Sequence, residues 1–378
     1  MNMEKKITVA VVGLWFGAHL AEIYAAHPDV KRLVLVDQVE ERVRWCYNAC
    51  KHFSSNVEIY DSFEDVLKDS DIDAVQITTG IPSHAELTIK ALNAGKHCAC
   101  AVPMATSLED LKRIVETVRK TGKKYMMLET MIYGTPFLYA QEMLERGEFG
   151  KIQYMRGVHL QPMEGWPDYW NGLPPMHYAT HAIAPLRVIA GSRIKEVVCI
   201  GSGTMSEELV KQYNNPYPVE DALLKFENGL GAEVVRSLFE CSMKQSESYN
   251  IYGSKKSFMY EYKNEVWEWL YDPAVGNRDD YKTDVIHYPN RYELLPEEIQ
   301  RFTIVDEFSD DWKSRLDTAP WSVHEASHPH MIHEFVTSIL EDRKPFLDEE
   351  LSANITAAGI CAHISAMNGG TLETVPEF

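Results

Sequence analysis

Two glycines and an aspartate near the N-terminus have residue types and a spacing that could hold a charged, ribose-bearing ligand. Gly13 and Gly17 follow the apolar run 7–12, and Asp37 ends the next apolar run. A turn at Gly13 would bring backbone N–H groups to a helix N-terminus, which favours phosphate. The carboxylate of Asp37 can accept hydrogen bonds from both ribose hydroxyls and would repel a 2′-phosphate. The three residues predict a dinucleotide site that prefers NAD to NADP.

The turn departs from the full dinucleotide fingerprint, which is Gly-x-Gly-x-x-Gly/Ala. It reads Gly13-Leu14-Trp15-Phe16-Gly17-Ala18. Trp15 stands where the second glycine normally lets the backbone approach the pyrophosphate, and Gly17 takes over that role if the loop is shifted by one residue. A strand, turn and helix without a nucleotide is the alternative interpretation.

Strands and helices alternate around this turn as far as residue 128. The expected strands are 7–12, 33–36, 57–60, 74–79, 97–102 and 124–128, and the helices between them start near 16 and include 39–51, 63–68, 85–94 and 108–121. This alternation is typical of an α/β fold with a doubly wound parallel sheet, whose ligands bind beyond the carboxyl ends of the strands. One crevice would collect the residues Gly13, Asp37, Thr79, Val102 and Glu129. Glu129 is equally well interpreted as a cofactor contact or as a cap for the next helix.

Beyond residue 130 strands dominate. A helix at 136–146, a strand at 152–161 and a helix near 181–190 precede strands at 196–205, 222–227, 231–240 and 249–252. Asn228-Gly229 is a strong hairpin signal between two of these strands. An open, mainly antiparallel sheet is expected, with one face available for self-association as a homodimer or homotetramer. The charged and aromatic segment 262–321 is interpreted as an insertion, and helices at 330–341 and 351–367 close the chain.

Length and composition limit the possible classes of protein. A chain of 378 residues predicts two domains, 1–130 for the dinucleotide and 131–378 for substrate binding and oligomerisation. The net charge of −19 argues against nucleic acid and anionic membrane surfaces as partners. No apolar run reaches the roughly 18 residues of a membrane span, and no signal peptide is expected. Seven scattered cysteines fit reduced thiols in a cytoplasmic protein.

Several motifs together resemble the Gfo/Idh/MocA family, the glucose–fructose oxidoreductase and inositol dehydrogenase group. The resemblance covers essentially the whole chain and rests on 13–17, Asp37, Thr79 with Pro82 and His84, 94–97, His181 and 334–345. It implies a Rossmann domain, a second α/β domain with a large open sheet, bound NAD and a carbohydrate-like substrate. The residues that would contact the cofactor are Gly13, Trp15, Phe16, Gly17, Asp37, Thr79, Pro82, His84, Val102, Pro103 and Glu129.

The chain departs from the usual family pattern at two motifs. The family has Glu-Lys-Pro after Ala-Gly-Lys-His, and its lysine polarises the reacting hydroxyl. Here the tripeptide is Ala101-Val102-Pro103, and valine has neither a proton to exchange nor a hydrogen bond to donate. The second departure is at the family's Asp-x-x-x-His helix, where His177 replaces the aspartate. An ordinary lysine-assisted dehydrogenase is therefore not expected.

The run Tyr178-Ala179-Thr180-His181 is similar to the Tyr-x-Thr-His motif of one branch of the family. This branch comprises the NAD-dependent glycosidases of the α-N-acetylgalactosaminidase type, which also have Val-Pro in place of Lys-Pro. In them the sugar's C3 hydroxyl is oxidised, the aglycone leaves by elimination, water adds and the ketone is reduced again. The match fails at Ala101, where that branch has a glutamate.

The resemblance assigns catalytic roles to the motif 177–181. His181 would be the base at the oxidised hydroxyl, because the unperturbed pKa of histidine lies near 6.5. Tyr178 would donate a hydrogen bond or move the C2 proton, and His177 would bind a neighbouring hydroxyl. Residues three and four apart share one helix face. The alternative is that these residues only pack at a helix start.

Three groups of residues could bind the substrate. The aromatic loop contributes Trp166, Asp168, Tyr169, Trp170 and Asn171, which suit either the faces and hydroxyls of a sugar or a small hydrophobic plug. His159 and Gln161 alternate on the preceding strand and could line the same pocket. In the cluster His324, His328, His330 and His333, sugar-hydroxyl contacts at His328 and His330 are favoured over a metal, and packing is an equal alternative. Pro329 is expected to break the helix there, and no metal site is predicted.

These residues predict an NAD-dependent carbohydrate enzyme that removes hydride from the carbon of a ring hydroxyl, expected at C3. Redox-neutral glycoside cleavage is preferred because of Val102 and the Tyr-x-Thr-His motif. A plain NAD-dependent sugar or inositol dehydrogenase, with His181 alone as base, is the first alternative. A non-catalytic NAD-binding sensor is the second, indicated by Ala101, Val102 and Trp15.

Overall fold

The computed structural model describes residues 5–378 except 242–244, 262–267, 273–281, 287 and 306. The chain forms two compact units. The first consists of Met1–Thr135 and Pro289–Ala353, and the second of Pro136–Tyr288 and Asn354–Phe378. The chain therefore passes between the units three times, first a few residues after the predicted boundary at 130, and the segment 289–353 returns to the first unit.

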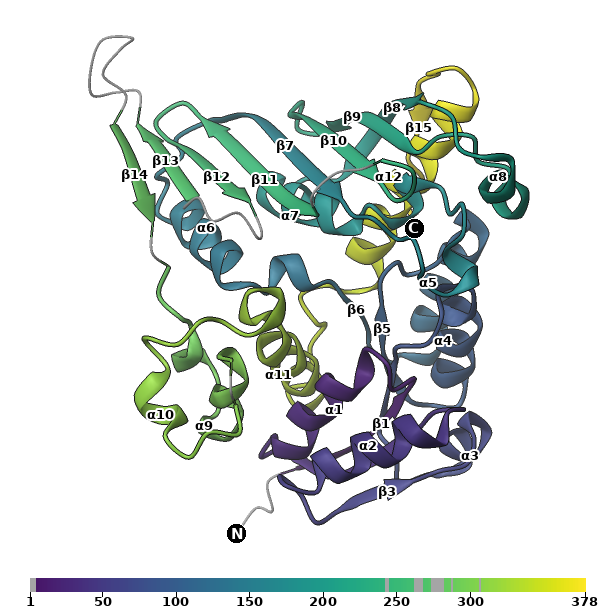
Figure 1. Cartoon of the computed structure of the whole chain (residues 1–378), viewed down its shortest axis with the longest axis vertical. Helices are drawn as coiled ribbons and strands as arrows, with labels where there is room; N and C mark the ends of the chain where they lie inside the picture. The colour runs from purple at the N-terminus through teal and green to yellow at the C-terminus, as the bar shows by residue number, and fades with distance from the viewer. Residues whose placement is uncertain (1–4, 242–244, 262–267, 273–281, 287, 306) are drawn as a thin grey trace. The chain divides into compact units, whose positions relative to one another are not determined.

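Six strands form the sheet of the first unit, in the order β3-β2-β1-β4-β5-β6 (Figure 1). All neighbouring strands in it are parallel. The strands are β1 (Ile7–Val12), β2 (Val30–Val36), β3 (Val57–Ile59), β4 (Ala74–Ile77), β5 (His97–Ala101) and β6 (Tyr125–Leu128). β1 and β4 are buried along their whole length, as central strands covered on both faces should be. The predicted parallel sheet is confirmed.

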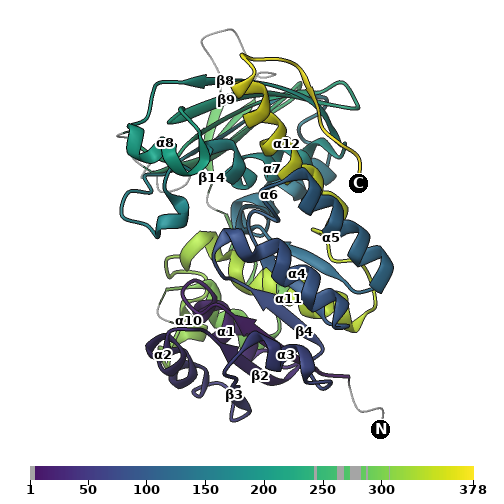
Figure 2. The ribbon, with the colours of Figure 1, turned by 90° about the vertical axis from the view of Figure 1, so that its right-hand side faces the viewer.

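Helices cover both faces of this sheet. The strand order runs outward from β1 and β4 in opposite directions, so right-handed crossovers place the helices of the two halves on opposite faces. α1, α2 and α11 lie on one face, and α4 and α5 lie on the other (Figure 2). The helices of this unit include α1 (Gly17–Ala26), α2 (Glu40–Cys50), α3 (Phe63–Lys68), α4 (His84–Asn93), α5 (Leu108–Thr121) and α11 (Ser327–Leu340).

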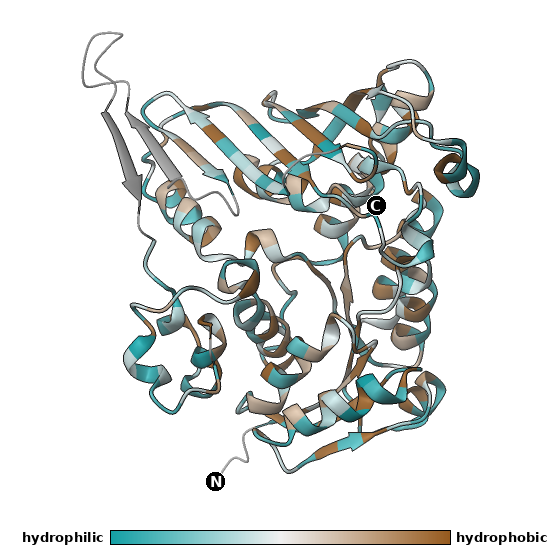
Figure 3. Ribbon diagram, in the orientation of Figure 1, coloured by the Kyte–Doolittle hydropathy of each residue, from teal (hydrophilic) through white to brown (hydrophobic). Residues whose placement is uncertain are grey.

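The second unit contains a nine-stranded sheet in the order β14-β13-β12-β11-β7-β10-β9-β8-β15. β7 and β10 are parallel, and the other described pairs are antiparallel. Hydrophobic and hydrophilic residues alternate along β9, β10 and β11, as a sheet with one covered face requires (Figure 3). The strands are β7 (Ile152–Leu160), β8 (Ile194–Ser202), β9 (Val219–Phe226), β10 (Gly231–Ser237), β11 (Ser246–Gly253), β12 (Ser257–Glu261), β13 (Glu268–Asp272), β14 (Lys282–Ile286) and β15 (Glu373–Thr374).

The helix α7 (Thr180–Ala190) approaches β7 closely because Gly157 has no side chain. A Cβ at Gly157 would collide with the carbonyl oxygen of Ala182. This contact places the first turn of α7 beside the end of β7. The other helices of the unit are α6 (Thr135–Glu145), α8 (Glu207–Tyr213) and α12 (Glu349–Met367).

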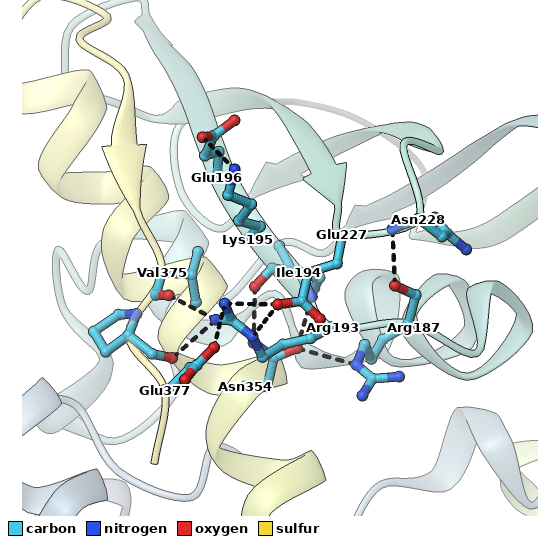
Figure 4. Close-up of polar contacts among 12 residues, drawn as sticks. Arg187, Arg193, Ile194, Lys195, Glu196, Glu227, Asn228, Asn354, Val375 and Glu377 are labelled. Atoms are coloured by element: carbon cyan, nitrogen blue, oxygen red, sulfur yellow. Dashed lines mark hydrogen bonds and ion pairs between the residues drawn. The ribbon is translucent and has the colours of Figure 1, made fainter.

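Asn354 ties α12 to α7 and β8 (Figure 4). Its side-chain oxygen accepts hydrogen bonds from Nε of Arg187 and from the backbone N–H of Ile194, each at 3.0 Å. Its amide group donates to the carbonyl oxygen of Ile194, also at 3.0 Å. Arg193 adds contacts to Glu227 and to the carbonyl oxygen of Val375. The buried face of the sheet and the C-terminal segment are therefore joined by polar contacts as well as by apolar packing.

Some elements differ from the sequence predictions. The helix expected at 330–341 begins at Ser327, and Pro329 lies in its first turn. The prediction that Pro329 breaks this helix was wrong, because an N–H in the first turn has no partner within the helix and proline can replace it. α8, β12 and β15 were not predicted. The insertion 262–321 is partly outside the described residues, and its described part contains β13, β14 and the short helices α9 (Glu297–Gln300) and α10 (Trp312–Arg315). None of the described helices has the length and apolar character that crossing a membrane requires.

Candidate active site

Two glycines hold the turn after β1 against the end of β4. Gly13 has a φ of +91°, and a Cβ there would lie 2.6 Å from the carbonyl oxygen of Thr78. A Cβ on Gly17 would collide with the hydroxyl of Thr78, which donates to the carbonyl oxygen of Gly13 at 2.6 Å. Glycine at both positions therefore lets the turn pack directly against the end of β4, and the turn leads into the N-terminus of α1, where an anion site of this kind lies.

Replacing Gly13 with alanine is expected to destabilise the protein by about 3 kcal/mol, because the new methyl group would meet the backbone of Thr78 at an unfavourable φ. Gly122→Ala is the matched control: its φ is +65°, but a Cβ there has no neighbour within 4 Å. This control should cost only about 1 kcal/mol. Urea unfolding of both variants would measure the difference, and equal losses would show that the contact with Thr78 does not matter.

The carboxylate of Asp37 lies beside this turn. Its Oδ2 accepts a hydrogen bond from the backbone N–H of Leu14 at 2.6 Å, and its Oδ1 accepts one from Val39 at 2.8 Å. A carboxylate has about four acceptor positions, so both oxygens can still accept ribose hydroxyls. Arg42 lies 3.9 Å from the carboxylate and 5.7 Å from the ring centre of Trp15. Trp15 itself is 53% exposed, so its side chain does not fill the turn.

Asp37→Ala is expected to weaken NADH binding about 10- to 100-fold, since hydrogen bonds to a charged group contribute about 1.5–3 kcal/mol. The preference over NADPH should fall with it, because the charge that repels a 2′-phosphate is gone. Fluorescence titration with both nucleotides measures this change. Glu40→Ala removes a nearby exposed carboxylate that pairs with Arg44, and it should bind both as the wild type does. Unchanged NADH affinity in Asp37→Ala would place the ribose elsewhere.

The other residues predicted at the strand ends organise the loops of the first unit. His84 is buried, and its two ring nitrogens lie 2.9 Å from the carbonyl oxygen of Pro103 and 3.1 Å from that of Thr79. Burial lowers the pKa of His84. The hydroxyl of Thr79 pairs with Ser83, and Glu129 caps the turn after it by accepting from the N–H of Met131 at 3.1 Å. Pro82 is exposed, whereas Val102 is buried. Direct contact of these residues with the cofactor stays a prediction.

Two of the predicted substrate-binding histidines belong to the first unit. The ring of His328 lies 5.4 Å from that of Phe16 and 5.0 Å from that of His324, so it packs against the dinucleotide turn. Burial lowers the pKa of His330 to about 3, with His333 adding to the effect. His330 and His328 are both almost fully buried. Among the described residues, no three His, Cys, Asp or Glu side chains are arranged to hold a metal ion.

The predicted catalytic residues meet in the second unit. The ring of His181 lies 5.1 Å from that of His159 and 5.5 Å from that of Tyr178. Trp170 packs edge-on against Tyr178, with ring centres 4.7 Å apart. The indole N–H of Trp170 is buried and has no hydrogen-bond partner in the described part of the chain. The structure therefore brings together a base candidate, a phenol and an aromatic wall with a free donor.

The aromatic loop continues outward from Trp170. Trp166 and Tyr169 each lie 5.8 Å from its ring, and Trp166 is 41% exposed. Asp168 is exposed, and Asn171 donates its backbone N–H to the carbonyl oxygen of Asp168 at 3.0 Å. Aromatic rings and polar side chains thus occur on one short loop next to Tyr178, an arrangement compatible with either sugar binding or packing.

His177 points to a different group of side chains. Its ring lies 5.1 Å from that of His363, whose Nδ1 is 2.7 Å from a carboxylate oxygen of Glu220. The other oxygen of Glu220 accepts the backbone N–H of Met176 at 2.8 Å. Burial lowers the pKa of His177 to about 3, so the ring is neutral at pH 7. Its buried Nδ1 has no partner among the described residues and could bind a hydroxyl group.

A row of ionisable side chains crosses four strands beneath this site, and the sequence did not reveal it. Arg236 on β10 is in register with His159 on β7 and with Glu220 on β9. Glu247 on β11 is in register with His159, and its carboxylate lies 3.1 Å from Nε2 of that residue. All four are buried on the covered face of the sheet. The sequence signal that could have indicated it is a polar residue in each of four strands, at a position where the alternation predicts an apolar one.

Arg236 is fully buried at the centre of this row. Its Nε donates to the carbonyl oxygen of Tyr178 at 2.8 Å, and one terminal nitrogen donates to the carbonyl oxygens of His159 and Ser237 at 2.9 and 2.6 Å. The other terminal nitrogen donates to the side-chain oxygen of Gln161 at 3.0 Å. Burial lowers the pKa of Arg236 to about 9, which leaves it charged at pH 7. His159, whose pKa is lowered to about 3 mainly by burial and then by Arg236, is neutral there.

Both units match family models. Residues 7–129 match the model described as an oxidoreductase family with an NAD-binding Rossmann fold, and residues 137–259 match the GFO/IDH/MocA C-terminal domain. Together these ranges cover more than half of the chain. The chain belongs to the Gfo/Idh/MocA oxidoreductase family. The predicted family and the NAD cofactor are confirmed, and the glycine turn that leads from Gly13 into α1 and the carboxylate of Asp37 fit this cofactor.

Curated relatives of this Gfo/Idh/MocA protein are named as glycosidases. It is 30% identical to glycosyl hydrolase family 109 protein 1 of Phocaeicola vulgatus over 227 residues, 55% of this chain and 48% of the relative. It is 28% identical to the family 109 protein of Porphyromonas gingivalis over 246 residues, 59% of this chain and 51% of the relative. The matched regions thus span about half of these relatives. The predicted resemblance to the glycosidase branch is confirmed.

Solved structures share the fold at lower identity. A levoglucosan dehydrogenase in complex with NADH and levoglucosan has a TM-score of 0.79 and 18% identity, covering 99% of this chain and 100% of its own. The apo scyllo-inositol dehydrogenase of Lactobacillus casei has a TM-score of 0.69 and 19% identity, covering 98% of this chain and 99% of its own. These likenesses establish the same α/β architecture, with the Rossmann sheet and the second, mainly antiparallel sheet.

Proposed function

We propose that the protein is an NAD-dependent carbohydrate enzyme that cleaves glycosides without net oxidation. The observation that carries this proposal is the cluster of His181, Tyr178 and His159 next to Trp170. A base, a phenol and an aromatic wall are what oxidation and elimination at a sugar ring require. The names of the family 109 relatives support the same class of reaction.

The first step is removal of the proton from the C3 hydroxyl. His181 is the proposed base, because it sits at the start of α7 with a neutral His159 beside it. NAD, when bound, supplies the hydride acceptor and later the hydride donor, and Gly13 and Asp37 are the residues that would hold it. The side chain of Val102 can neither accept nor donate a proton, so base catalysis is proposed to rest on the second unit rather than on a lysine.

The second step is elimination. A ketone at C3 acidifies the C2–H bond, so a modest base can take this proton while the C1–O bond breaks. Tyr178 is the proposed group at C2, and His177, with its free buried nitrogen, is proposed to bind a neighbouring hydroxyl. Trp166, Trp170, Asp168 and Asn171 are proposed to hold the sugar. No oxocarbenium ion forms, so no pair of carboxylates at glycosidase spacing is needed.

The decisive assay offers aryl α- and β-glycosides in D2O to the purified protein, with NAD supplied only in catalytic amount. Release of the aryl group without net NADH, together with deuterium at C2 of the freed sugar, is the expected result. Stoichiometric NADH from free sugars without aryl release would overturn the glycosidase and leave a dehydrogenase.

A plain sugar dehydrogenase is the second candidate. Structural neighbours that are named levoglucosan dehydrogenase and scyllo-inositol dehydrogenase favour it, although their identity to this chain is below 20%. In that case His181 alone would serve as base, and Tyr178 would only orient the substrate. The two candidates differ in one measurable feature, exchange of the C2 proton, which oxidation alone does not require.

A further inference from the structure

We propose that Arg236 is a positioning residue that sets both the place and the charge state of Tyr178, and so makes it the base at C2. This inference rests on the proposed function and deepens it. Arg236 is fully buried, and its hydrogen bonds run to Tyr178, His159, Ser237 and Gln161, so it acts through these groups and not on the substrate.

The position of Tyr178 depends on Arg236 through the backbone. The Nε–H group of Arg236 binds the carbonyl oxygen of Tyr178 at 2.8 Å, immediately before the first turn of α7. On the other side, Glu220 binds the N–H of Met176 at 2.8 Å. Two residues in register on neighbouring strands therefore hold the segment 176–178 at both ends. Four of the five N–H donors of the guanidinium group are engaged, which fixes its plane.

The charge of Arg236 also lies next to the ring. Its guanidinium carbon is 5.3 Å from the centre of the Tyr178 ring. A buried positive charge at this distance favours the phenolate over the phenol, because the low dielectric of the interior screens it weakly. The carbonyl oxygens that solvate Arg236 are neutral, so they do not cancel its charge.

Among the other titratable groups around Tyr178, the carboxylate of Glu247 acts electrostatically on Arg236 and offsets part of this field. His159 on β7 is neutral at pH 7, and Glu247 on β11 lies behind it. His181 on α7 faces the ring. Glu220 on β9 and His363 on α12 lie behind His177 and bind each other at 2.7 Å. Among the described residues, the positive charge that lies against the ring of Tyr178 is therefore the guanidinium group of Arg236.

The proposed proton transfer runs from C2 of the sugar to the phenolate oxygen of Tyr178. The phenolate oxygen of Tyr178 forms an O–H bond with the C2 proton, and the C2–H electron pair forms the C1–C2 double bond. The C1–O bond breaks, and its electron pair leaves with the aglycone. The ketone at C3, made in the preceding step of the proposed function, is retained. Addition of water later returns a proton from Tyr178 to C2.

The first test compares Arg236→Lys with Arg236→Gln by the pH dependence of kcat/KM for an aryl glycoside. Loss of the charge in Arg236→Gln should move the ascending limb upward by about one to two pH units and lower the rate at pH 7 by about 10- to 100-fold. Arg236→Lys keeps the charge, so its limb should stay near that of the wild type, with a lower plateau from the lost fork of hydrogen bonds. Equal losses in both variants with unmoved limbs would overturn the inference, because a purely structural role predicts that result.

A second test needs no variant at Arg236, which matters if Arg236→Gln does not fold. The tyrosinate absorbance of the wild type is titrated against that of Tyr178→Phe. The wild type should contain one phenol that ionises well below the usual pH of about 10, and Tyr178→Phe should lack it. Absence of this difference would overturn the inference even if glycosides are cleaved. If this difference is present but no sugar is turned over, the inference about Arg236 is supported and only the proposed function is contradicted.

Discussion

His181→Ala is expected to lower sugar turnover about 1,000-fold while NADH binds as tightly as in the wild type. A positioned general base contributes typically 10²–10⁴-fold, and no second base stands at the lysine position, which is Val102. His181 lies in the second unit, whereas Gly13 and Asp37 lie in the first, so cofactor affinity should not change. Steady-state kinetics and NADH fluorescence measure the two effects separately.

Tyr178→Phe distinguishes the two enzyme classes when it is compared with His181→Ala. If Tyr178 moves the C2 proton, Tyr178→Phe should lose aryl release and C2 exchange but still reduce bound NAD in a single turnover with a sugar. His181→Ala should lose both activities. His19→Ala, an exposed helix histidine, and Tyr252→Phe on β11 are the matched controls and should behave as the wild type. Absence of turnover in the wild type as well as in both variants, with NADH still bound by all three, would favour the non-catalytic sensor.

The dinucleotide-binding half could be predicted from the sequence because its signals are local. Ser62 and Ser107 cap helices by accepting from Asp65 and Asp110, and both helices have the predicted bounds. Gly122 ends the second of these helices with a φ of +65°. Such signals lie within a few residues of the element that they delimit, so one sequence is enough to find them.

The row beneath the candidate active site could not be predicted, because it depends on strand register. Arg236, His159, Glu220 and Glu247 come together only when β10, β7, β9 and β11 pair in one particular register, and a shift of one residue would turn each side chain to the other face. The sequence shows each residue only as one polar position within its own strand. His159 and Gln161 were predicted from their alternation alone, and Arg236, which binds both, was missed for that reason.

Lowering the pH from 7 to 5.5 is expected to destabilise the protein by several kcal/mol. His27 and His330 in the first unit, and His159 and His177 in the second, have pKa values lowered from 6.5 to about 3, in each case chiefly by burial. Between these values the unfolded chain binds a proton at each site and the folded chain does not, so stability falls as the pH falls below 6.5. Each histidine contributes about 1 kcal/mol over this range.

The slope of stability against pH counts the protons that the chain takes up on unfolding, so histidine variants can identify the residues that cause the loss of stability in acid. His330→Leu fills a buried position whose Nε2 has no partner among the described residues, so the variant should fold and should lose about one proton from the slope of stability against pH. His19→Gln, at an exposed site, should leave the slope unchanged. Urea unfolding between pH 7.5 and 5 measures this slope, and a flat profile would show that the buried histidines are protonated in the folded protein.

Glu22 acts in the opposite direction over the same range. Its pKa is raised to about 7 by burial and then by Glu307, so the folded protein holds this proton more tightly than the unfolded chain does. Its contribution is fully present below pH 4.5 and is lost as the pH rises through 7. Glu22→Gln should therefore make the acid loss steeper by about one proton and raise stability above pH 7. Urea unfolding of the wild type and Glu22→Gln between pH 6 and 5 would measure this difference, and equal slopes would show that Glu22 is ionised in the folded protein.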